Sequence, residues 1–286
     1  METEISRKTR LSYSMQDLKK IQEKETEKAF SKQALIFDDI YGSNPIIQYK
    51  RERVRGHVLK FIKSGSEILE LNSGTGEDAI WFAQNGFLVH ATDISEGMQE
   101  MLVKKIHSNN LDSKITYEIC SFNDLSELKN KGPFDSIFSN FAGLNCTGEL
   151  NKVLDSFDPL LKPGGIVTLV ILPRFCLWET LLFFRGNFKT AFRRFFSKNG
   201  VKAHIEGEYF TCWYYDPSYV INRMNKKYTI LDIEGLCTIV PPSYLENFPM
   251  KRPGLFMRLK KLEMKYKNSW PWKSIGDYYI ISMQKK

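Results

Sequence analysis

The chain has 286 residues, of which 42% are hydrophobic and 13% aromatic, and its formal net charge is +8 at pH 7. This composition can bury a substantial core, which excludes a disordered or low-complexity chain. The longest apolar run, Ile166–Leu172, has only the length of a strand, and the charged N-terminus lacks an apolar signal segment. The five cysteines form no CxxC or Cys/His cluster. We therefore expect a reduced, cytoplasmic protein with no transmembrane segment, disulfide framework or metal site.

The positive charge is regional. Residues 172–202 carry a net charge of +6 and residues 250–286 carry +8, so the remaining chain is −6. Such regions suit an acidic small molecule, an acidic carrier protein or peripheral contact with an anionic membrane. A net charge of +8 without an added RNA-binding module disfavours nucleic acid. The oligomeric state stays open.

Two helices are expected before the first strand. The first runs from an N-cap at Ser14 to about Ile40, and the segment Tyr41–Pro45 ends it because it carries Gly, Asn and Pro. The second covers about Ile47–Ile62, with apolar residues on one face.

Short apolar strands then alternate with helices. The expected strands are Ile68–Leu71, Leu88–Ala91, Ile115–Ile119, Ser136–Ser139, Ile166–Leu172, Tyr228–Gly235 and Tyr278–Met283. The expected helices are Glu77–Asn85, Ser95–Ser108 and Glu149–Leu161. This alternation is typical of an α/β fold, in which helices flank a parallel sheet.

The segment after the fifth strand has a different composition. A basic aromatic helix is expected over about Leu177–Ser197, followed by a stretch rich in Trp and Tyr. Its apolar stripe would be Trp178, Leu182, Phe188, Ala191 and Phe192, beside Arg185, Lys189, Arg193 and Arg194. Packing on the sheet, binding of an acidic aromatic or acyl substrate, and contact with a membrane or carrier protein all remain open.

The most informative segment is the turn Gly74–Gly76, which joins the first strand to a helix. Glycines allow the tight turn and let a ligand approach the backbone. Asp93 ends the next strand, where a carboxylate accepts both hydroxyls of a ribose.

Two kinds of cofactor compete for this arrangement. The spacing also satisfies the dinucleotide fingerprint GxGxxA, so a nicotinamide-dependent oxidoreductase is one reading. Against it stand three acids around the loop, Glu70, Glu77 and Asp78, which disfavour a pyrophosphate at the helix N-terminus. A cofactor with a positively charged amino-acid end suits these acids better.

Five segments, in order, resemble the motifs of class I S-adenosylmethionine (SAM)-dependent methyltransferases. They are E-L-N-S-G-T-G at Glu70–Gly76, A-T-D-I-S at Ala91–Ser95, C-S-F-N-D-L at Cys120–Leu125, F-D-S-I-F-S-N-F-A-G-L-N at Phe134–Asn145, and L-K-P-G-G at Leu161–Gly165. The chain most resembles bacterial methyltransferase-domain proteins of the small-molecule type.

The resemblance implies one Rossmann-like domain over residues 1–286. Its sheet would have seven mostly parallel strands with an antiparallel last strand, and helices on both faces. Residues 1–65 would form a helical lid and 66–172 the SAM-binding core. Residues 173–228 would form a helical acceptor-site insertion, and 229–286 the C-terminal strands and a basic helix.

The resemblance also implies which residues hold SAM, whose product is S-adenosylhomocysteine (SAH). Glu70, Gly74 and Gly76 would lie along the methionine moiety, and Asp93 would hold the ribose. The remaining cofactor candidates are Tyr41 in the lid, Asn72 in the loop, Ile94, Met98, Ser121 and Phe122 around adenine, and Asn140 near the sulfonium. Ser121 departs from the family, which often has Asp there.

Methyl transfer is an in-line displacement that mainly needs an aligned nucleophile, so no catalytic triad is expected. Candidate catalytic residues are Asn140, Glu179 and Tyr215. The segment Ser139–Ala142 is not the [DN]PPY motif of enzymes that methylate exocyclic or amide nitrogens. We expect methylation of a small-molecule or lipid-like acceptor, on oxygen. The alternatives are an NAD-dependent oxidoreductase, an RNA methyltransferase and a catalytically silent SAM-fold partner protein.

Overall fold

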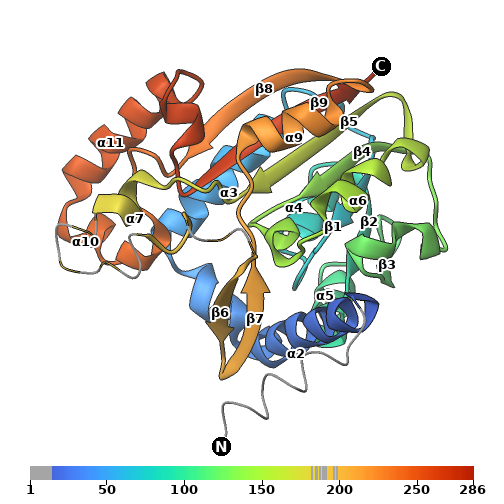
Figure 1. The fold of residues 1–286 in the computed structure, drawn as a ribbon. Helices are drawn as coiled ribbons and strands as arrows, with labels where there is room; N and C mark the ends of the chain where they lie inside the picture. The colour runs from blue at the N-terminus through green and yellow to red at the C-terminus, as the bar shows by residue number, and fades with distance from the viewer. Residues whose placement is uncertain are drawn as a thin grey trace, which may run out of the picture.

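The computed structural model describes residues 15–181, 183, 186, 188, 192–195, 197 and 199–286. These residues form a seven-stranded sheet of order β3-β2-β1-β4-β5-β9-β8 (Figure 1). The strands are β1 (Glu67–Leu71), β2 (Leu88–Asp93), β3 (Ile115–Ile119), β4 (Phe134–Ser139), β5 (Leu161–Ile171), β8 (Tyr228–Leu236) and β9 (Tyr278–Lys285). From β3 to β5 all neighbours pair in parallel, whereas β9 is antiparallel to both β5 and β8. The expected mostly parallel sheet with an antiparallel last strand is confirmed.

Helices cover both faces of the sheet. The helices before α10 include α2 (Met15–Gly42), α3 (Pro45–Val58), α4 (Glu77–Gln84), α5 (Glu96–Ser108), α6 (Leu150–Asp155) and α9 (Pro217–Met224). One core packs Val54, Phe82 and Leu102 from α3, α4 and α5 against the sheet. The other packs Val153 of α6 and Val220 of α9 against the opposite face. Because both faces are covered, most residues of the central strands β1, β4 and β5 are buried.

Single 3₁₀ turns occupy several of the connections. They are η1 (Phe122–Glu127), η2 (Gly143–Cys146), η3 (Asp158–Leu160), η5 (Ser243–Leu245) and η6 (Trp272–Ser274). The first two follow β3 and β4 directly, so they lie at the carboxyl edge of the sheet.

Among the described residues, two helices precede the first strand, as expected, but the boundary between them differs. Tyr41 lies within α2 and not in the turn, which is reduced to the residues around Asn44. The Asn44 side chain caps α3 by accepting hydrogen bonds from the backbone N–H groups of Ile46 and Ile47. The expected N-cap Ser14 lies outside the described residues.

Helix α2 lies across α5 and the hairpin of β6 (Val201–Ile205) and β7 (Glu208–Cys212) (Figure 1). The approach to α5 is close, because a Cβ placed on Gly97 would lie 3.1 Å from the carbonyl oxygen of Ser31. The hydroxyls of Ser31 and Ser95 also share a hydrogen bond of 2.8 Å.

The segment after β5 is not the long helix that the sequence predicted. Helix α7 (Leu177–Leu181) is short, and Gly186 has a left-handed φ of 77°, which interrupts helical backbone. Leu182, Arg185, Lys189 and Ala191 of the expected stripe lie outside the described residues. A hairpin follows, formed by β6 (Val201–Ile205) and β7 (Glu208–Cys212).

The hairpin was missed although the sequence carries a signal for it. Glu206 and Gly207 form its two-residue connection with φ values of 46° and 80°. Two positive φ values are typical of the type I′ turn, which favours glycine.

Between β8 and β9 lie α10 (Phe248–Lys251) and α11 (Pro253–Tyr266). Glu263 of α11 is fully buried and accepts hydrogen bonds from the backbone N–H groups of residues 237–240, just after β8. Arg53 of α3 neutralises the same carboxylate at 3.1 Å. These contacts fix α11 against the body of the protein. No helix among the described residues combines the length and hydropathy of a membrane-spanning segment.

Candidate active site

A cavity of about 390 Å³ opens at the carboxyl ends of β1, β2 and β4, beneath α2 and beside the hairpin. Its lining contains seven of the residues expected to bind cofactor, namely Tyr41, Asn72, Gly74, Asp93, Ile94, Met98 and Phe122. Carboxyl ends of adjacent parallel strands meet at one sheet edge, and ligands of α/β folds bind there.

The two glycines of the loop after β1 have different roles. Gly74 has a φ of 55°, and a Cβ added to it would meet nothing within 4 Å, so its backbone borders open space. Gly76 has a φ of 83°, and a Cβ there would lie 2.2 Å from Leu102 Cδ1. Gly74 leaves room for a ligand, whereas Gly76 permits the packing of α5 and is not part of the cavity lining.

Asp93 joins the ends of β1 and β2. Its Oδ2 accepts the N–H of Gly74 and its Oδ1 accepts the N–H of Ser95, both at 2.9 Å. Burial raises the pKa of this carboxyl, and the backbone hydrogen bonds partly oppose that rise. Each oxygen keeps a second lone pair, so the carboxylate can also accept the hydroxyls of a ribose.

Glu70 lies behind the loop, outside the cavity lining. It is buried, and its Oε2 has no hydrogen-bond partner. Burial first and the nearby Asp78 second raise its pKa well above the usual range, while Arg55 and Arg51 oppose the rise. A buried acceptor without a donor is costly, so this oxygen favours a ligand that brings a donor such as an ammonium group.

The N-terminus of α4 is occupied by acidic side chains. Arg55 Nε donates to Asp78 Oδ1 at 2.8 Å, and Lys105 Nζ donates to Glu77 Oε1 at 2.7 Å. Asn140 Nδ2 donates to the other Asp78 oxygen at 2.7 Å. These groups take the place that the pyrophosphate of a dinucleotide would need.

The three expected catalytic side chains do not line the cavity. Asn140 is turned toward Asp78, and its Oδ1 accepts the N–H of Phe141. Tyr215 is buried and donates to the carbonyl of Thr147. Glu179 is buried in ion pairs with arginine, which hold the pKa of its carboxyl below the usual range despite its burial. The geometry therefore gives none of the three a place beside an acceptor.

Ser121 also lies outside the lining, although its neighbour Phe122 is part of it. Its hydroxyl donates to Glu23 Oε1 of α2 at 2.7 Å, and Asn123 Nδ2 donates to the same oxygen at 2.7 Å. Sequence reasoning missed Glu23, because it lies on a helix whose charges read as solvated. The helix thus supplies a carboxylate at the segment where the expected acidic residue is replaced by Ser121.

Two cations on the wall were also missed. Lys50 is buried, and its Nζ donates to Asp277 Oδ2 at 2.8 Å and to Ser243 Oγ at 3.2 Å. Arg51 is buried over the Phe141 ring; its nearest ion-pair contact, at 3.8 Å, is Glu77 Oε2, and its Nε has no hydrogen-bond partner. In the sequence both belong to the run YKRERVR, which reads as the polar face of a helix.

Two groups of potential metal ligands lie away from the cavity, and each already holds a cation. Lys60 contacts both carboxylates of the first group, and Arg194 bridges both carboxylates of the second at 2.6 and 2.9 Å. The groups are His57 with Asp232 and Glu234, and Cys176 with Glu179 and Asp277. A metal ion would have to displace these side chains.

Comparison with known proteins matches the core of the chain. Residues 68–165 match the sequence model of the methyltransferase domain family. A demethylmenaquinone methyltransferase from Clavibacter sepedonicus is 32% identical over 106 residues, which cover 37% of this chain and 41% of that protein. The chain therefore aligns with less than half of the length of this curated relative.

Solved structures extend the similarity in fold to most of the chain. A chain from Listeria monocytogenes, assigned as a SAM-dependent methyltransferase, superposes with a TM-score of 0.58 at 16% identity, covering 83% of this chain and 98% of that one. The 1,6-didemethyltoxoflavin N1-methyltransferase of Burkholderia thailandensis was solved with 1,6-didemethyltoxoflavin and SAH bound. It superposes with a TM-score of 0.54 at 12% identity, covering 92% of this chain and 88% of that one. Identities this low show a shared fold.

The sheet order, the glycine loop and the carboxylate that ends β2 together define the class I, SAM-dependent methyltransferase fold. The match to the methyltransferase domain family covers residues 68–165 of the 286 residues, so it describes the core of the sheet and not the whole chain.

Proposed function

We propose that the protein is an enzyme that transfers the methyl group of SAM to an acidic oxygen of a small, largely apolar acceptor. The observation that carries this proposal is one cavity that joins the cofactor loop to a wall of aromatic side chains and two buried cations. One cavity of this kind suits two ligands that must meet for an in-line displacement.

The cofactor half of the site would use the loop and the end of β2. Gly74 leaves space for the methionine moiety, Asp93 accepts the ribose hydroxyls, and Ile94 and Met98 pack on adenine. Bound SAM supplies an electrophilic methyl group on its sulfonium.

The acceptor half is apolar and aromatic. Its wall comprises Phe30, Phe37, Phe141, Leu172, Phe210 and Tyr278. Such a wall excludes water and favours a flat or lipid-like acceptor. Lys50 and Arg51 add positive charge to the same cavity, so an acceptor that carries a negative oxygen is favoured over a neutral amine.

Deprotonation would rest on these cations and not on a protein base. Burial raises the pKa of Tyr278 to about 12 and that of the Cys212 thiol to about 11, so both stay protonated at neutral pH. Lys50 remains an ammonium, because Asp277 outweighs the effect of its burial and raises its pKa. The cations lower the pKa of an acceptor hydroxyl that lies beside them, and this favours methylation on oxygen.

Helix α2 would serve as the lid of this site. One stripe of the helix, spaced by three or four residues, contributes Thr26, Phe30, Gln33, Phe37 and Tyr41 to the lining. Asp38 of the same helix accepts a hydrogen bond of 2.7 Å from the Thr75 hydroxyl in the glycine loop. A helix that contacts both halves of the site must shift for ligands to enter or leave.

The relatives' names support a small-molecule acceptor, since one is named for demethylmenaquinone and another for 1,6-didemethyltoxoflavin.

A small-molecule methyltransferase, an RNA methyltransferase and a catalytically silent protein predict different labelled products. The deciding experiment incubates the full chain with methyl-labelled SAM and a cell extract, then separates organic solutes, RNA and protein. We expect label in an organic-extractable small molecule, in an amount that depends on Asp93. Label in RNA or protein would replace the proposed acceptor class, and SAH binding without label would favour a silent partner protein.

A further inference from the structure

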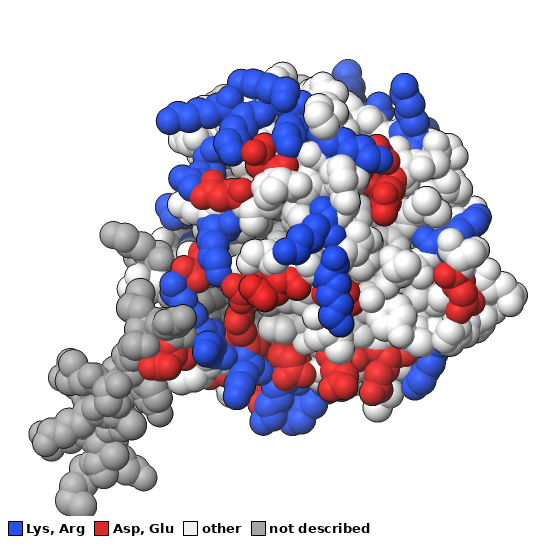
Figure 2. Space-filling model, turned by 90° about the vertical axis from the view of Figure 1, so that its right-hand side faces the viewer, with Lys and Arg blue, Asp and Glu red and all other residues white. Residues whose placement is uncertain are grey.

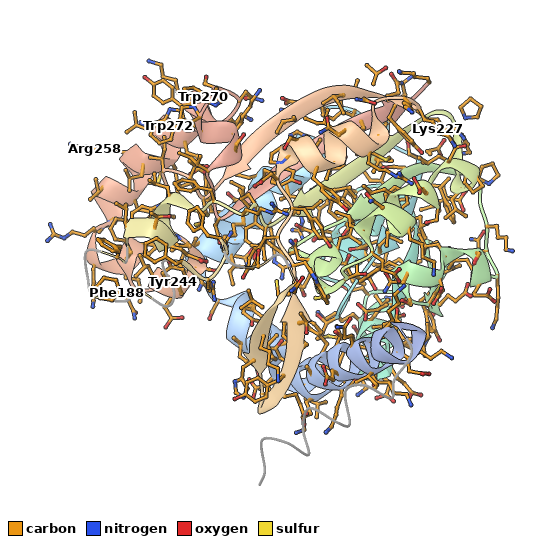
Figure 3. The ribbon with its side chains drawn as sticks, in the orientation of Figure 1. Phe188, Lys227, Tyr244, Arg258, Trp270 and Trp272 are labelled. Carbon is orange, nitrogen blue, oxygen red and sulfur yellow. The ribbon has the colours of Figure 1, made fainter. Side chains whose placement is uncertain are left out.

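The side of the molecule that carries α7, α10 and α11 exposes an unusual number of apolar side chains. Figure 3 shows Phe188, Tyr244, Arg258, Trp270 and Trp272 along this side, with Lys227 on the opposite one. Trp270 is 82% exposed and Met250 70% exposed. We call this surface the α11 face and define it by Phe188, Tyr244, Met250, Leu255, Met257, Arg258, Lys261, Leu262, Met264, Lys265 and Trp270. Exposed apolar clusters of this size mark interaction sites.

Helix α11 has a buried inner stripe and an exposed outer side on which a cationic ridge lies between two apolar rows. Phe256 and Glu263, seven residues apart, form the buried stripe of the helix. On the outer side Arg258, Lys261 and Lys265, spaced by three and four residues, form an exposed cationic ridge. Methionines 257 and 264 lie along one side of this ridge, and leucines 255 and 262 along the other.

The cations of this face have no acidic counterparts in their own segment. Residues 247–273 contain eight Lys and Arg but a single acid, Glu263, which is buried and held by Arg53. Figure 2, which shows the opposite side of the molecule, has acidic and basic side chains interspersed over much of its surface. The charged residues that define the α11 face are therefore all positive, with the exposed Glu246 near its edge at Tyr244, whereas the other side of the protein is mixed.

We propose that the α11 face docks on an anionic lipid bilayer. Exposed Trp, Phe and Met side chains insert at the boundary between headgroups and acyl chains, while Lys and Arg contact the acidic headgroups. A second copy of this chain suits the face poorly, because a twofold interface would bring the cationic ridges of both copies together. The positive charge of the α11 face is therefore complementary to an anionic bilayer and not to a second copy of the chain.

The position of the face relative to the cavity is consistent with this role. Ser243 lines the cavity, and Tyr244, the next residue in η5, is half exposed and belongs to the α11 face. The turn Ser243–Leu245 therefore contributes to both surfaces. If the proposed function holds, a lipid-like acceptor would reach the cavity from the bilayer past this turn, although docking itself does not depend on methyl transfer.

The test is sedimentation of the full chain with vesicles of phosphatidylcholine, with or without about 30 mol% phosphatidylglycerol. We expect binding to the anionic vesicles only, weakened when NaCl rises from about 0.1 M to about 0.5 M. The double variant Arg258→Glu/Lys261→Glu should lower the partition coefficient at least about tenfold. Trp270→Ala should lower binding at both salt concentrations, because it removes insertion and not charge.

A matched control separates local docking from net charge. Lys226→Glu/Lys227→Glu makes the same change in charge on the opposite side and should leave vesicle binding nearly intact. Equal loss in both double variants would overturn the proposal, as would equal binding to neutral vesicles or no binding to anionic ones. A dimer in solution that Arg258→Glu/Lys261→Glu dissolves would assign the face to a second copy instead. SAH affinity is measured on every variant. An unchanged affinity shows that the fold and the proposed cofactor site are intact, independently of the result with vesicles.

Discussion

At the scale of single residues, the site depends on side chains that serve both structure and ligand. Asp93 accepts the backbone N–H groups of Gly74 and Ser95 while it faces the cavity. Arg51 is buried, lines the same cavity and keeps an unpaired Nε. Such residues test the assignment of the cofactor more directly than the catalytic candidates do.

Asp93→Ala should weaken SAH binding about a hundredfold or more, because two hydrogen bonds to a charged acceptor are lost. Isothermal titration calorimetry with SAH measures this loss. The control Asp112→Ala removes an exposed carboxylate that pairs only with His107, and it should bind as the unmodified protein does. Equal affinity in the unmodified protein and Asp93→Ala would remove Asp93 from the cofactor site.

Because the proposed function places Arg51 beside the acceptor, Arg51→Met should leave binding of SAH and of 5′-methylthioadenosine unchanged. Calorimetry with both ligands measures this. The two ligands share the nucleoside, and only SAH carries the amino-acid carboxylate that a guanidinium would recognise. Equal loss for both ligands would show that Arg51 supports the fold, and a loss for SAH alone would assign Arg51 to the cofactor instead of the acceptor.

At the scale of elements, the glycine loop links β1 to α4 and α5. Gly76→Ala should lower the unfolding midpoint in urea more than Gly74→Ala, although both replace glycines of positive φ. The reason is the contact with Leu102, since a Cβ on Gly76 would overlap its side chain, whereas one on Gly74 meets open space. Gly74→Ala should instead mainly weaken SAH binding. The opposite ranking in both measurements would contradict the assigned roles.

The segment after β5 is held by buried ion pairs, which predicts a loss of stability in acid. Burial raises the pKa of Glu179 and Asp277, but the cations beside them more than offset this, so both values are lower in the folded protein. A carboxyl with a lowered folded pKa stabilises the protein above its unfolded pKa, and this stability is lost as the pH falls toward the folded value. Urea unfolding between about pH 7 and pH 3 should show this decline.

Glu179→Gln should cost about 3–5 kcal/mol at neutral pH, because it leaves the buried Arg194 without one of its charges. The variant should also lose less of its unfolding free energy than the unmodified protein does as the pH falls. Glu208→Gln offers a matched control, because Glu208 pairs with Lys28 and Lys32 at the surface. An unchanged urea unfolding midpoint for Glu179→Gln would refute the structural role of the ion pair between Glu179 and Arg194.

At the scale of the whole molecule, the cavity is lined on one side by α2, which lies far in sequence from the strands that form its floor. Hydrogen exchange of α2 should slow when SAH binds, because the stripe from Thr26 to Tyr41 lines the cavity. Amides of β8 and β9 serve as the internal control and should not change. Protection confined to the glycine loop would mean that α2 does not act as a lid.

The sequence by itself determined the sheet and the cofactor loop. Both are local patterns: apolar strands alternate with helices, and a glycine turn is followed by Asp93 at the end of the next strand. The hairpin of β6 and β7 was missed, because its Glu206-Gly207 turn is a weaker signal than the aromatic residues around it.

Only the tertiary structure decided which polar side chains face the cavity. Asn140 contacts Asp78, Glu179 pairs with two arginines, and Tyr215 donates to Thr147. Lys50 and Arg51, by contrast, line the cavity from α3, which precedes β1. These partners are distant in sequence, and no local pattern encodes whether a charged side chain is paired internally or turned toward a cavity. The regional positive charge is likewise visible in the sequence, but folding alone shows it as a cationic ridge between apolar side chains on α11.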